Sequence, residues 1–335
     1  MATTSAEIVK LEGEVRHFKA TLAKYQQMFS RDGTITATEA KHINDVKTII
    51  GKVSARLATA KAKISPNVSD PAVTDRAERV ARESSELGVS DATITDNIKY
   101  EYKEIVANLF ATGHGDDNEI HPNDVKQGYL GDCYFLAAIQ AIAQSNPAAL
   151  KKLIKDNGDG TYDITLYVHK YFISWNRKPV IITVNATVPV AEGGTRPIYA
   201  GVGDQELWVL LLEKAYAQYK GDYGDIEGGY ASKAMGVLLG ENGDTFSTRA
   251  LSDEDLAAKI QGALDGRQAI TASSNTKTKK TESVIVDGQL IYYSHAYNLL
   301  KFEGGIVYLQ NPHGRNHVQL SVSDFKRYYR IIAIQ

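Results

Sequence analysis

Residues 127–138 read Gln127-Gly128-Tyr129-Leu130-Gly131-Asp132-Cys133-Tyr134-Phe135-Leu136-Ala137-Ala138. Cys133 is the only cysteine of the chain, and it begins an apolar run that predicts a helix over 133–144. A thiol at a helix N-terminus lies at the positive end of the peptide dipoles, which favours the thiolate. The thiolate is the reactive form, so this position suits a nucleophile. On local sequence alone, a lone cysteine is more often a small buried core residue.

Gln127 adds a second feature to this stretch. It lies upstream of Cys133 across a loop that contains Gly128 and Gly131, and glycines allow such a loop to fold back. The Gln127 side-chain amide then comes beside the Cys133 backbone N–H. Two donors in that arrangement form an oxyanion hole, which stabilises the tetrahedral intermediate of acyl transfer.

A predicted β-hairpin far downstream carries a histidine and an asparagine. Its strands are 290–302, with His295, and 306–311, which ends at Asn311. A three-residue loop places the two side chains on one face, a diagonal step of roughly 7–8 Å apart at the backbone. A two-residue turn shifts the register by one and sends Asn311 to the other face. We therefore expect a three-residue loop over 303–305, or a bulge that restores the register.

Composition excludes several classes of protein. The chain has 335 residues, 43% hydrophobic and 23% charged, with a net charge of −2. This is the composition of a globular protein, and it lacks the basic face that nucleic-acid binding needs. The N-terminus does not resemble a secretory signal, and no apolar stretch reaches membrane-spanning length. We expect a cytoplasmic protein without disulfides, and the sequence does not indicate its oligomeric state.

Composition and periodicity divide the chain into four parts. Residues 1–65 carry two apolar stripes at helical spacing and predict a helical hairpin. Residues 66–92 are rich in small, charged and proline residues and predict a linker. From residue 93 the pattern is that of a mixed α+β enzyme, which we divide at 243/244. The first part carries Cys133 and a further helix around 207–220, whereas strands dominate the second, notably 330–335.

Four blocks follow one another over residues 115–325. They are 127–138, then Glu206-Leu207-Trp208 with Leu212-Glu213-Lys214-Ala215-Tyr216-Ala217 and Gly228-Gly229, then His295-Ala296-Tyr297, and finally Asn311-Pro312-His313-Gly314. In order and spacing these blocks resemble the calpain family of papain-like cysteine proteases. The resemblance covers about two-thirds of the chain, and four ordered blocks are far more specific than any single motif.

The resemblance implies a papain-like core of two lobes, a helical lobe with Cys133 and a β-rich lobe with His295 and Asn311. It implies peptide-bond hydrolysis, with Cys133 as nucleophile and His295 as general base and then acid. Asn311 orients the imidazole in this scheme, and Gln127 donates to the oxyanion. Proteins or peptides are the implied substrates.

Substrate contacts and a brake also follow from the resemblance. Gly229 and the residue before the histidine hold the substrate backbone, although the family usually has glycine where this chain has Ser294. The family tryptophan that covers the His–Asn bond, and that without calcium can wedge the two halves apart, is His313 here. The tryptophan after the cysteine is Tyr134.

Calcium is the one cofactor that the resemblance implies. Asp124 and Glu206 occupy the places of two family ligands in the first lobe, with backbone carbonyls near Asp117 and Glu119 completing an oxygen shell. A second family site is poorly matched, because His317 stands where a glutamate is expected. We expect one calcium site, in the first lobe.

Three functions remain open from the sequence. The first is a cysteine endopeptidase that is modulated by calcium and cleaves its own linker within 66–92, since an exposed linker is an accessible site. The alternative is a catalytically silent scaffold that binds partners through its N-terminal helices. A transglutaminase-type acyltransferase shares the Cys–His chemistry, but it normally has aspartate where this chain has Asn311.

Overall fold

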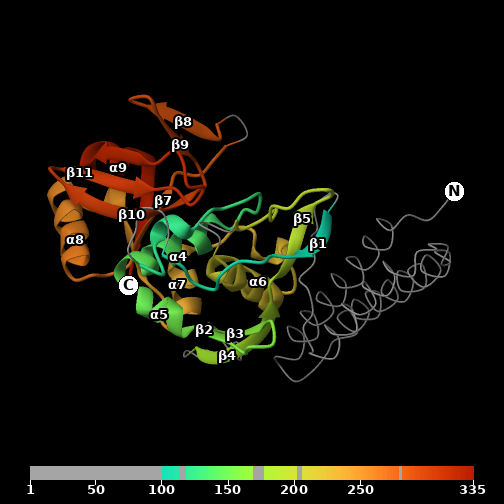
Figure 1. The fold of residues 1–335 in the computed structure, drawn as a ribbon. Coiled ribbons are helices and arrows are strands. Elements are labelled where there is room, and N and C mark those ends of the chain that lie inside the picture. The colour runs from blue at the N-terminus through green and yellow to red at the C-terminus, as the bar shows by residue number, and fades with distance from the viewer. Residues whose placement is uncertain (1–99, 113–117, 169–176, 202–205, 279–280) are drawn as a thin grey trace, which may run out of the picture. The chain divides into compact units, whose positions relative to one another are not determined.

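The computed structural model describes residues 100–112, 118–168, 177–201, 206–278 and 281–335, all within one compact unit (Figure 1). The expected hairpin over 1–65 and linker over 66–92 lie outside these residues. The helices are α4 (Cys133–Ser145), α5 (Pro147–Lys152), α6 (Trp208–Lys220), α7 (Ala231–Leu239), α8 (Asp253–Asp265) and α9 (Val322–Tyr328), with the short 3-10 turns η1 (Pro122–Asp124), η3 (Gly224–Ile226) and η4 (Thr248–Ala250). The strands are β1 (Tyr100–Glu104), β2 (Ile154–Asp156), β3 (Thr161–Val168), β4 (Lys178–Asn185), β5 (Thr187–Ala191), β6 (Asp244–Ser247), β7 (Ile270–Ser274), β8 (Ser283–Val286), β9 (Gln289–Tyr292), β10 (Ala296–Glu303), β11 (Ile306–Gln310), β12 (Val318–Ser321) and β13 (Tyr329–Ile334).

Helix α4 is buried on every side. Each residue from Tyr134 to Ala143 is buried, and a helix that is apolar all round belongs in a protein interior. It contacts α7 and the strand β10, and Phe135 stacks on Tyr216 of α6 with ring centroids 4.4 Å apart. The predicted helix over 133–144 is confirmed, and its position explains its unusually apolar composition.

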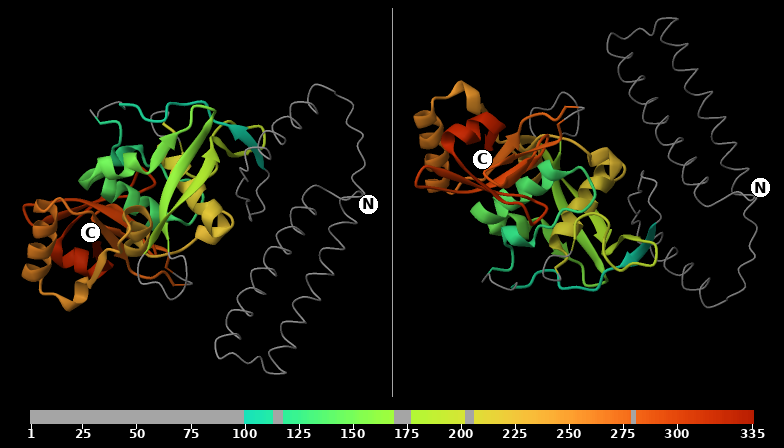
Figure 2. Two further views of the ribbon diagram at one scale, coloured as in Figure 1. Left: turned by 90° about the horizontal axis from the view of Figure 1, so that it is seen from below. Right: turned by 90° about the horizontal axis from the view of Figure 1, so that it is seen from above.

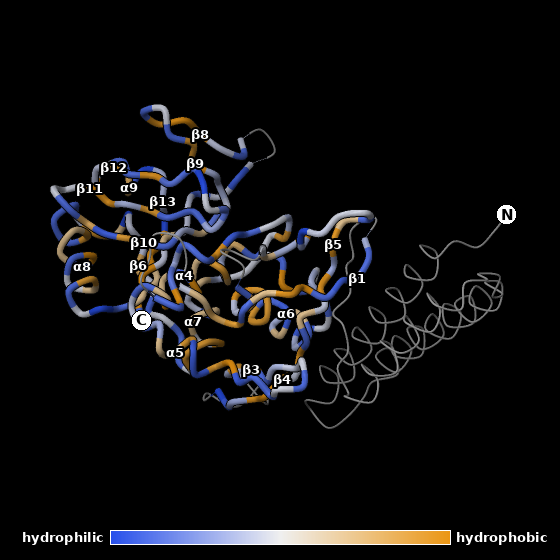
Figure 3. Tube along the Cα trace, viewed as in Figure 1, coloured by the Kyte–Doolittle hydropathy of each residue, from blue (hydrophilic) through white to orange (hydrophobic). Residues whose placement is uncertain are grey.

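A first buried cluster surrounds α4, α6 and α7 and extends to the antiparallel sheet β2-β3-β4. Apolar stretches of α6 and β3 stand out in Figure 3. Strand β3 alternates, with Ile164 and Leu166 buried and their neighbours partly exposed, as expected for a sheet with one covered face. This cluster supports the N-terminal end of α4, where Cys133 lies.

A second buried cluster belongs to a six-stranded antiparallel sheet of order β12-β11-β10-β7-β13-β6. Helices α8 and α9 contact its strands. Helix α8 is amphipathic, with Leu256, Ile260 and Ala263 buried, and Ser252 caps its first turn by accepting the Asp255 N–H. Strand β10 also contacts α4, so the sheet lies directly beside the cysteine-bearing helix (Figure 2).

The predicted strand over 290–302 is wrong as a single element. It divides into β9 and β10, because Ser294 between them adopts a left-handed backbone with φ of 49°, which a continuous strand excludes. β9 instead pairs with β8 in a separate hairpin, and β10 begins directly after His295. The break gives the residues around His295 a local geometry of their own.

The mixed α+β class is confirmed by these elements. The division at 243/244 and the papain-like arrangement of lobes stay predictions. No helix in the described part of the chain combines the length and the hydropathy required to cross a lipid bilayer.

Candidate active site

The turn between β10 and β11 has two residues. Glu303 pairs with Ile306, which leaves Gly304 and Gly305 as the turn. Both have positive φ, 59° and 79°, the conformation that matches the twist of the flanking strands and that glycine adopts most readily. The expected three-residue loop is therefore wrong.

A bulge restores the register that the turn would have lost. The pairing shifts by one between Leu299 and Lys301, where Leu300 is the extra residue. This was the second expected alternative, and it is confirmed. His295 Nε2 lies 2.9 Å from Asn311 Oδ1, so the two side chains share one face. Because Nε2 is engaged with Asn311, Nδ1 is the nitrogen that remains for another partner.

Cys133 is the first residue of α4 and is partly exposed. Its thiol contacts the backbone amide of Ala296, the residue directly after His295. The helix start and the histidine strand thus meet at the sulfur. The structure therefore brings Cys133, His295 and Asn311 into one cluster from three separate elements.

The pKa values of Cys133 and His295 do not favour the thiolate that the sequence predicts. Burial raises the pKa of the Cys133 thiol to about 11; the Ala296 amide lowers this pKa and the charge of Asp132 raises it. Burial lowers the pKa of His295 to about 4, although the hydrogen bond to Asn311 raises it. Desolvation opposes the helix dipole at this position, so the ligand-free pair consists of a neutral thiol and a neutral imidazole.

Aromatic rings enclose the His295 imidazole. His313 stacks on it with centroids 5.1 Å apart and an interplanar angle of 5°. Tyr297 and Tyr292 approach edge-on, at 4.8 Å and 5.8 Å. Asn311 Oδ1 also accepts the His313 N–H at 3.0 Å, so one amide oxygen orients both imidazole-bearing residues. These rings exclude water from the His–Asn hydrogen bond.

Gln127 lies in the loop before Cys133 and is tied to the asparagine segment. Its backbone N–H donates to Pro312 O at 2.9 Å, and its carbonyl accepts from the His313 ring. Its side-chain Nε2 donates to Leu130 O at 2.8 Å and lies 3.5 Å from Asp132 Oδ1. The second contact is long, so one N–H of the amide has no short hydrogen bond.

Gly229 and Ser294 have different local constraints. A Cβ at Gly229 would lie 2.4 Å from a ring carbon of Tyr134, so the ring closes over a backbone that only glycine permits. Ser294 holds its left-handed backbone through two hydrogen bonds, from its N–H to Asn275 O at 2.7 Å and from the Lys277 N–H to its Oγ at 2.9 Å. The structure does not assign either residue to substrate.

Asp124 and Glu206 are brought together as a buried carboxyl pair. Both are 1% exposed, and their side chains lie within hydrogen-bonding distance of each other. Glu206 also accepts the Ala111 N–H at 2.5 Å and the Trp208 Nε1–H at 3.0 Å. Burial, and next the charge of Asp124, raise the pKa of Glu206 to about 7.

An all-oxygen donor set of this kind fits a hard cation such as Ca²⁺, which would replace the proton that the pair otherwise retains. The expected carbonyl near Asp117 lies outside the described residues. Within them, no group of three or more His, Cys, Asp or Glu side chains forms a metal cluster.

Comparison with known proteins assigns the family. The profile described as "Calpain family cysteine protease" matches residues 102–333. This chain belongs to the calpain family of cysteine proteases. Among curated proteins it is 29% identical to Calpain-13 of Rattus norvegicus (57% of this chain, 29% of the relative) and 29% identical to the Calpain-type cysteine protease ADL1 of Oryza sativa subsp. japonica (58% and 9%). It is 28% identical to Calpain clp-4 of Caenorhabditis elegans (63% and 29%). The chain thus spans less than a third of the length of each of these calpains.

At four positions this calpain differs from the family pattern, and the structure shows what each substituted residue contacts or which backbone it adopts. His313, where the family has tryptophan, lies flat on His295 and so still covers the His–Asn hydrogen bond. Tyr134 replaces the tryptophan after the cysteine and lies against Gly229. Ser294 replaces a glycine and has the positive φ that favours glycine. His317 is no acidic ligand; its Nδ1 accepts the Asn311 N–H at 3.1 Å.

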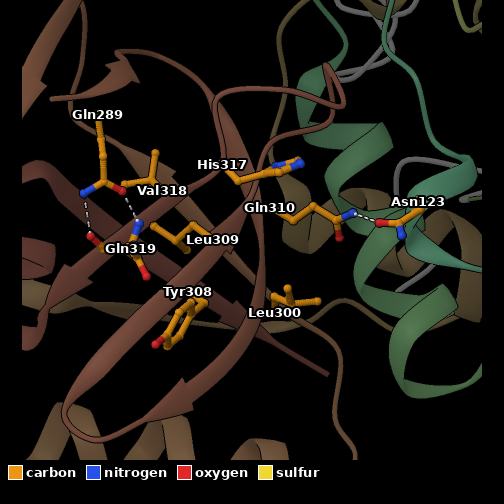
Figure 4. A pocket seen from close by; sticks show the side chains of 9 residues that line it. All are labelled: Asn123, Gln289, Leu300, Tyr308, Leu309, Gln310, His317, Val318 and Gln319. Carbon is orange, nitrogen blue, oxygen red and sulfur yellow. Dashed lines mark hydrogen bonds between the residues drawn. The ribbon is translucent and has the colours of Figure 1, made fainter. Parts of the chain in front are cut away.

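A network of amide side chains was missed by sequence reasoning. Asn298 donates to Gln144 Oε1 and Gln310 Oε1 at 3.0 Å and 3.1 Å, and Gln310 donates to Asn123 Oδ1 at 2.8 Å. Gln144 Nε2 donates to Leu300 O at the bulge, at 2.8 Å. Figure 4 shows Gln310 reaching Asn123 beside a pocket. Single polar residues in apolar elements were the available signal, but their partners come from distant segments.

Proposed function

We propose that this chain is a cysteine endopeptidase with a papain-like core of two lobes, in which Cys133, His295 and Asn311 form the catalytic triad. The main support is the hydrogen bond between His295 Nε2 and Asn311 Oδ1. It leaves His295 Nδ1 for the cysteine, whose thiol contacts the adjacent Ala296 amide. Family membership supports the same assignment.

In the proposed reaction the Cys133 thiol gives its proton to His295 Nδ1, and the thiolate attacks the substrate carbonyl carbon. The Cys133 N–H and the Gln127 N–H that makes no short hydrogen bond stabilise the oxyanion. The C–N bond breaks as the imidazolium protonates the leaving amine. Water, deprotonated by His295, then attacks the thioester, and the cysteine leaves as the thiolate and recovers its proton.

The neutral thiol–imidazole pair fits this sequence of steps. A thiol with a pKa of about 11 and a histidine with a pKa of about 4 hold the proton on sulfur until substrate reorganises the site. Asn311 fixes the ring so that Nδ1 faces the sulfur during the transfer. We propose that the backbone at Gly229 and Ser294 holds the substrate chain.

Calcium binding by Asp124 and Glu206 is part of the proposal. When bound, the ion would supply positive charge that lets both buried carboxyls ionise, and it would rigidify the segments that carry them. The two carboxyls join the loop before α4 to the start of α6. Ordering these segments supports the Cys133 loop.

Hydrolysis of casein and of a fluorogenic peptide by wild type and Cys133→Ala, each with calcium or chelator, tests the function. We expect new peptide termini with wild type only. Equal cleavage by both proteins would identify a contaminant and overturn the proposal. No cleavage by wild type, with no labelling of Cys133 by a thiol-reactive peptide probe, would favour the silent scaffold. Amide cross-links without new termini would favour the acyltransferase.

We also propose self-cleavage within 66–92. Incubating wild type beside Cys133→Ala tests this separately. Fragments from wild type alone, with cut sites located by mass spectrometry, support self-processing. Equal fragmentation of both proteins, or of neither, would contradict it without affecting the hydrolase assignment.

A further inference from the structure

Asp132 occupies the N-cap position of α4 without capping the helix. Its side chain makes no hydrogen bond to the first amides of the helix, although aspartate favours this position because it normally makes that bond. The side chain is fully buried and lies toward Gln127, whose Nε2 is 3.5 Å from Oδ1. Its Oδ2 is buried and has no donor among the described residues. An ionised carboxylate in that situation is strongly disfavoured.

Glu213 of α6 is the group that faces Asp132. It is 1% exposed, and the two carboxyls lie within hydrogen-bonding distance of each other. Both Glu213 oxygens accept the Ala200 N–H, at 3.0 Å and 3.1 Å. The Nζ of the adjacent Lys214 donates to Asn185 Oδ1 and to Thr187 O, each at 2.6 Å.

Two buried carboxylates in contact cannot both ionise without a large cost, so the pair retains a proton. Burial raises the pKa of Asp132 to about 7 and raises that of Glu213 well above its usual range. The other titratable groups that face Asp132 are Glu227 after η3 and Cys133 and Tyr134 of α4. Each of these is acidic, so none favours a second negative charge.

We propose that Asp132 and Glu213 share one proton behind the nucleophile, and that this proton positions Gln127 and the start of α4 for hydrolysis. The catalytic part rests on the proposed function, because Gln127 and Cys133 are the groups that the pair positions. The shared proton itself rests only on the buried contact.

The net charge of the Asp132–Glu213 pair, next to the Cys133 thiol, therefore changes with pH. With its proton, the pair carries one negative charge and Asp132 is held between Glu213 and Gln127. Without it, the pair carries two charges, which repel each other and oppose formation of the Cys133 thiolate. Reactivity of Cys133 should therefore rise less steeply with pH than that of a thiol without such a neighbour.

The variant Glu213→Gln tests this directly. A glutamine amide can donate to the Asp132 carboxylate and cannot itself ionise, so the variant never carries the second negative charge. Cys133 is the only cysteine, so its alkylation by iodoacetamide can be followed in the whole chain from pH 5 to 10. We expect equal rates in wild type and variant at pH 6 and about tenfold faster alkylation of the variant at pH 9, the change that one pKa unit produces. Glu254→Gln, on the exposed face of α8, is the matched control.

Infrared spectroscopy supplies a second readout that requires neither catalysis nor a variant. Wild type should show a protonated-carboxyl band at pH 6 that weakens as the pH rises through about 7. The difference between wild type and Glu213→Gln isolates the pair from Asp124 and Glu206, which both proteins keep. Asp132→Asn, whose amide donates to Glu213, makes the same test if Glu213→Gln does not fold.

Superimposable alkylation profiles of folded wild type and Glu213→Gln, or no protonated-carboxyl band at pH 6 in the difference between the two proteins, would overturn the shared proton. The rate of peptide hydrolysis should also depend on pH differently in the two proteins above neutral pH. If wild type and Glu213→Gln show the same dependence there, the shared proton has no positioning role. If no protein hydrolyses peptide but the alkylation and infrared results hold, the shared proton stands and the proposed function fails.

Discussion

His295 Nε2 lies 2.9 Å from Asn311 Oδ1, and it does so because Leu300 bulges out of β10, the strand that begins directly after the histidine. The two-glycine turn alone would have placed Asn311 on the opposite face. The freed carbonyl of Leu300 is not left unpaired, since Gln144 Nε2 donates to it from the cysteine-bearing helix. The bulge therefore aligns the histidine with the asparagine and also anchors α4.

Asn311→Ala should lower kcat for peptide hydrolysis roughly 10²-fold with a smaller change in KM, since the imidazole loses the acceptor that orients it. The variant also removes the acceptor of the His313 N–H, so the stacked pair should loosen. Steady-state kinetics of the folded variant measure the effect. An unchanged kcat would show that Asn311 has no part in the reaction.

His295 makes stability depend on pH in the acid range. Its pKa is about 4 in the folded chain against an ordinary value of 6.5, so the unfolded chain binds more protons between these values. The free energy of unfolding should therefore fall as pH drops from about 6.5 to 4, by at most about 1.4 kcal/mol per pH unit. His295→Gln should remove this part of the slope. Urea unfolding of both proteins across pH 4–8 measures this dependence. If the free energy of unfolding falls equally steeply with pH in both proteins, the depressed pKa of His295 is contradicted.

Gln144→Leu should weaken the connection between α4 and β10. It removes the bonds to Leu300 O and to Asn298 Nδ2, and we expect a loss of about 1–2 kcal/mol of stability and a fall in kcat larger than any change in KM. Gln261→Leu, on the exposed surface of α8, is the matched control. Equal effects of the two substitutions would exclude a role of Gln144 in alignment.

Calcium should raise the melting temperature of wild type but not of Glu206→Gln. Because the pKa of Glu206 is about 7, binding should release a proton below that pH, and affinity should increase as pH rises through 7. Titration calorimetry in two buffers of different ionisation enthalpy measures both quantities, with Mg²⁺ as the comparison ion. An equal calcium shift in wild type and Glu206→Gln would place any calcium site elsewhere.

Gly229→Ala should destabilise the chain by about 1–3 kcal/mol, because the new Cβ would lie 2.4 Å from the buried Tyr134 ring. Gly262→Ala is a matched control with the opposite expected sign. Gly262 lies within α8 with no atom within 4 Å of an added Cβ, so alanine should stabilise it by about 1 kcal/mol. Thermal unfolding distinguishes them, and equal shifts would contradict the close contact.

Local sequence determined the helix that begins at Cys133 and the family. An apolar run with one thiol at its start predicts a helix that begins at the thiol, because periodicity and the helix terminus are local properties. The order of the cysteine, histidine and asparagine blocks likewise needs no structure. The register of β10 and β11 was predictable only as two alternatives, since a bulge depends on contacts from outside the hairpin, here Gln144.

Tertiary structure decided the electrostatics. The sequence indicated a thiolate at Cys133, whereas burial raises its pKa, because desolvation depends on segments that the local sequence does not reveal. The same holds for the carboxyl pairs Asp132–Glu213 and Asp124–Glu206, whose members come from different elements. A sequence specifies which groups can ionise, but their protonation depends on the distance between groups and on their burial, which only the folded chain determines.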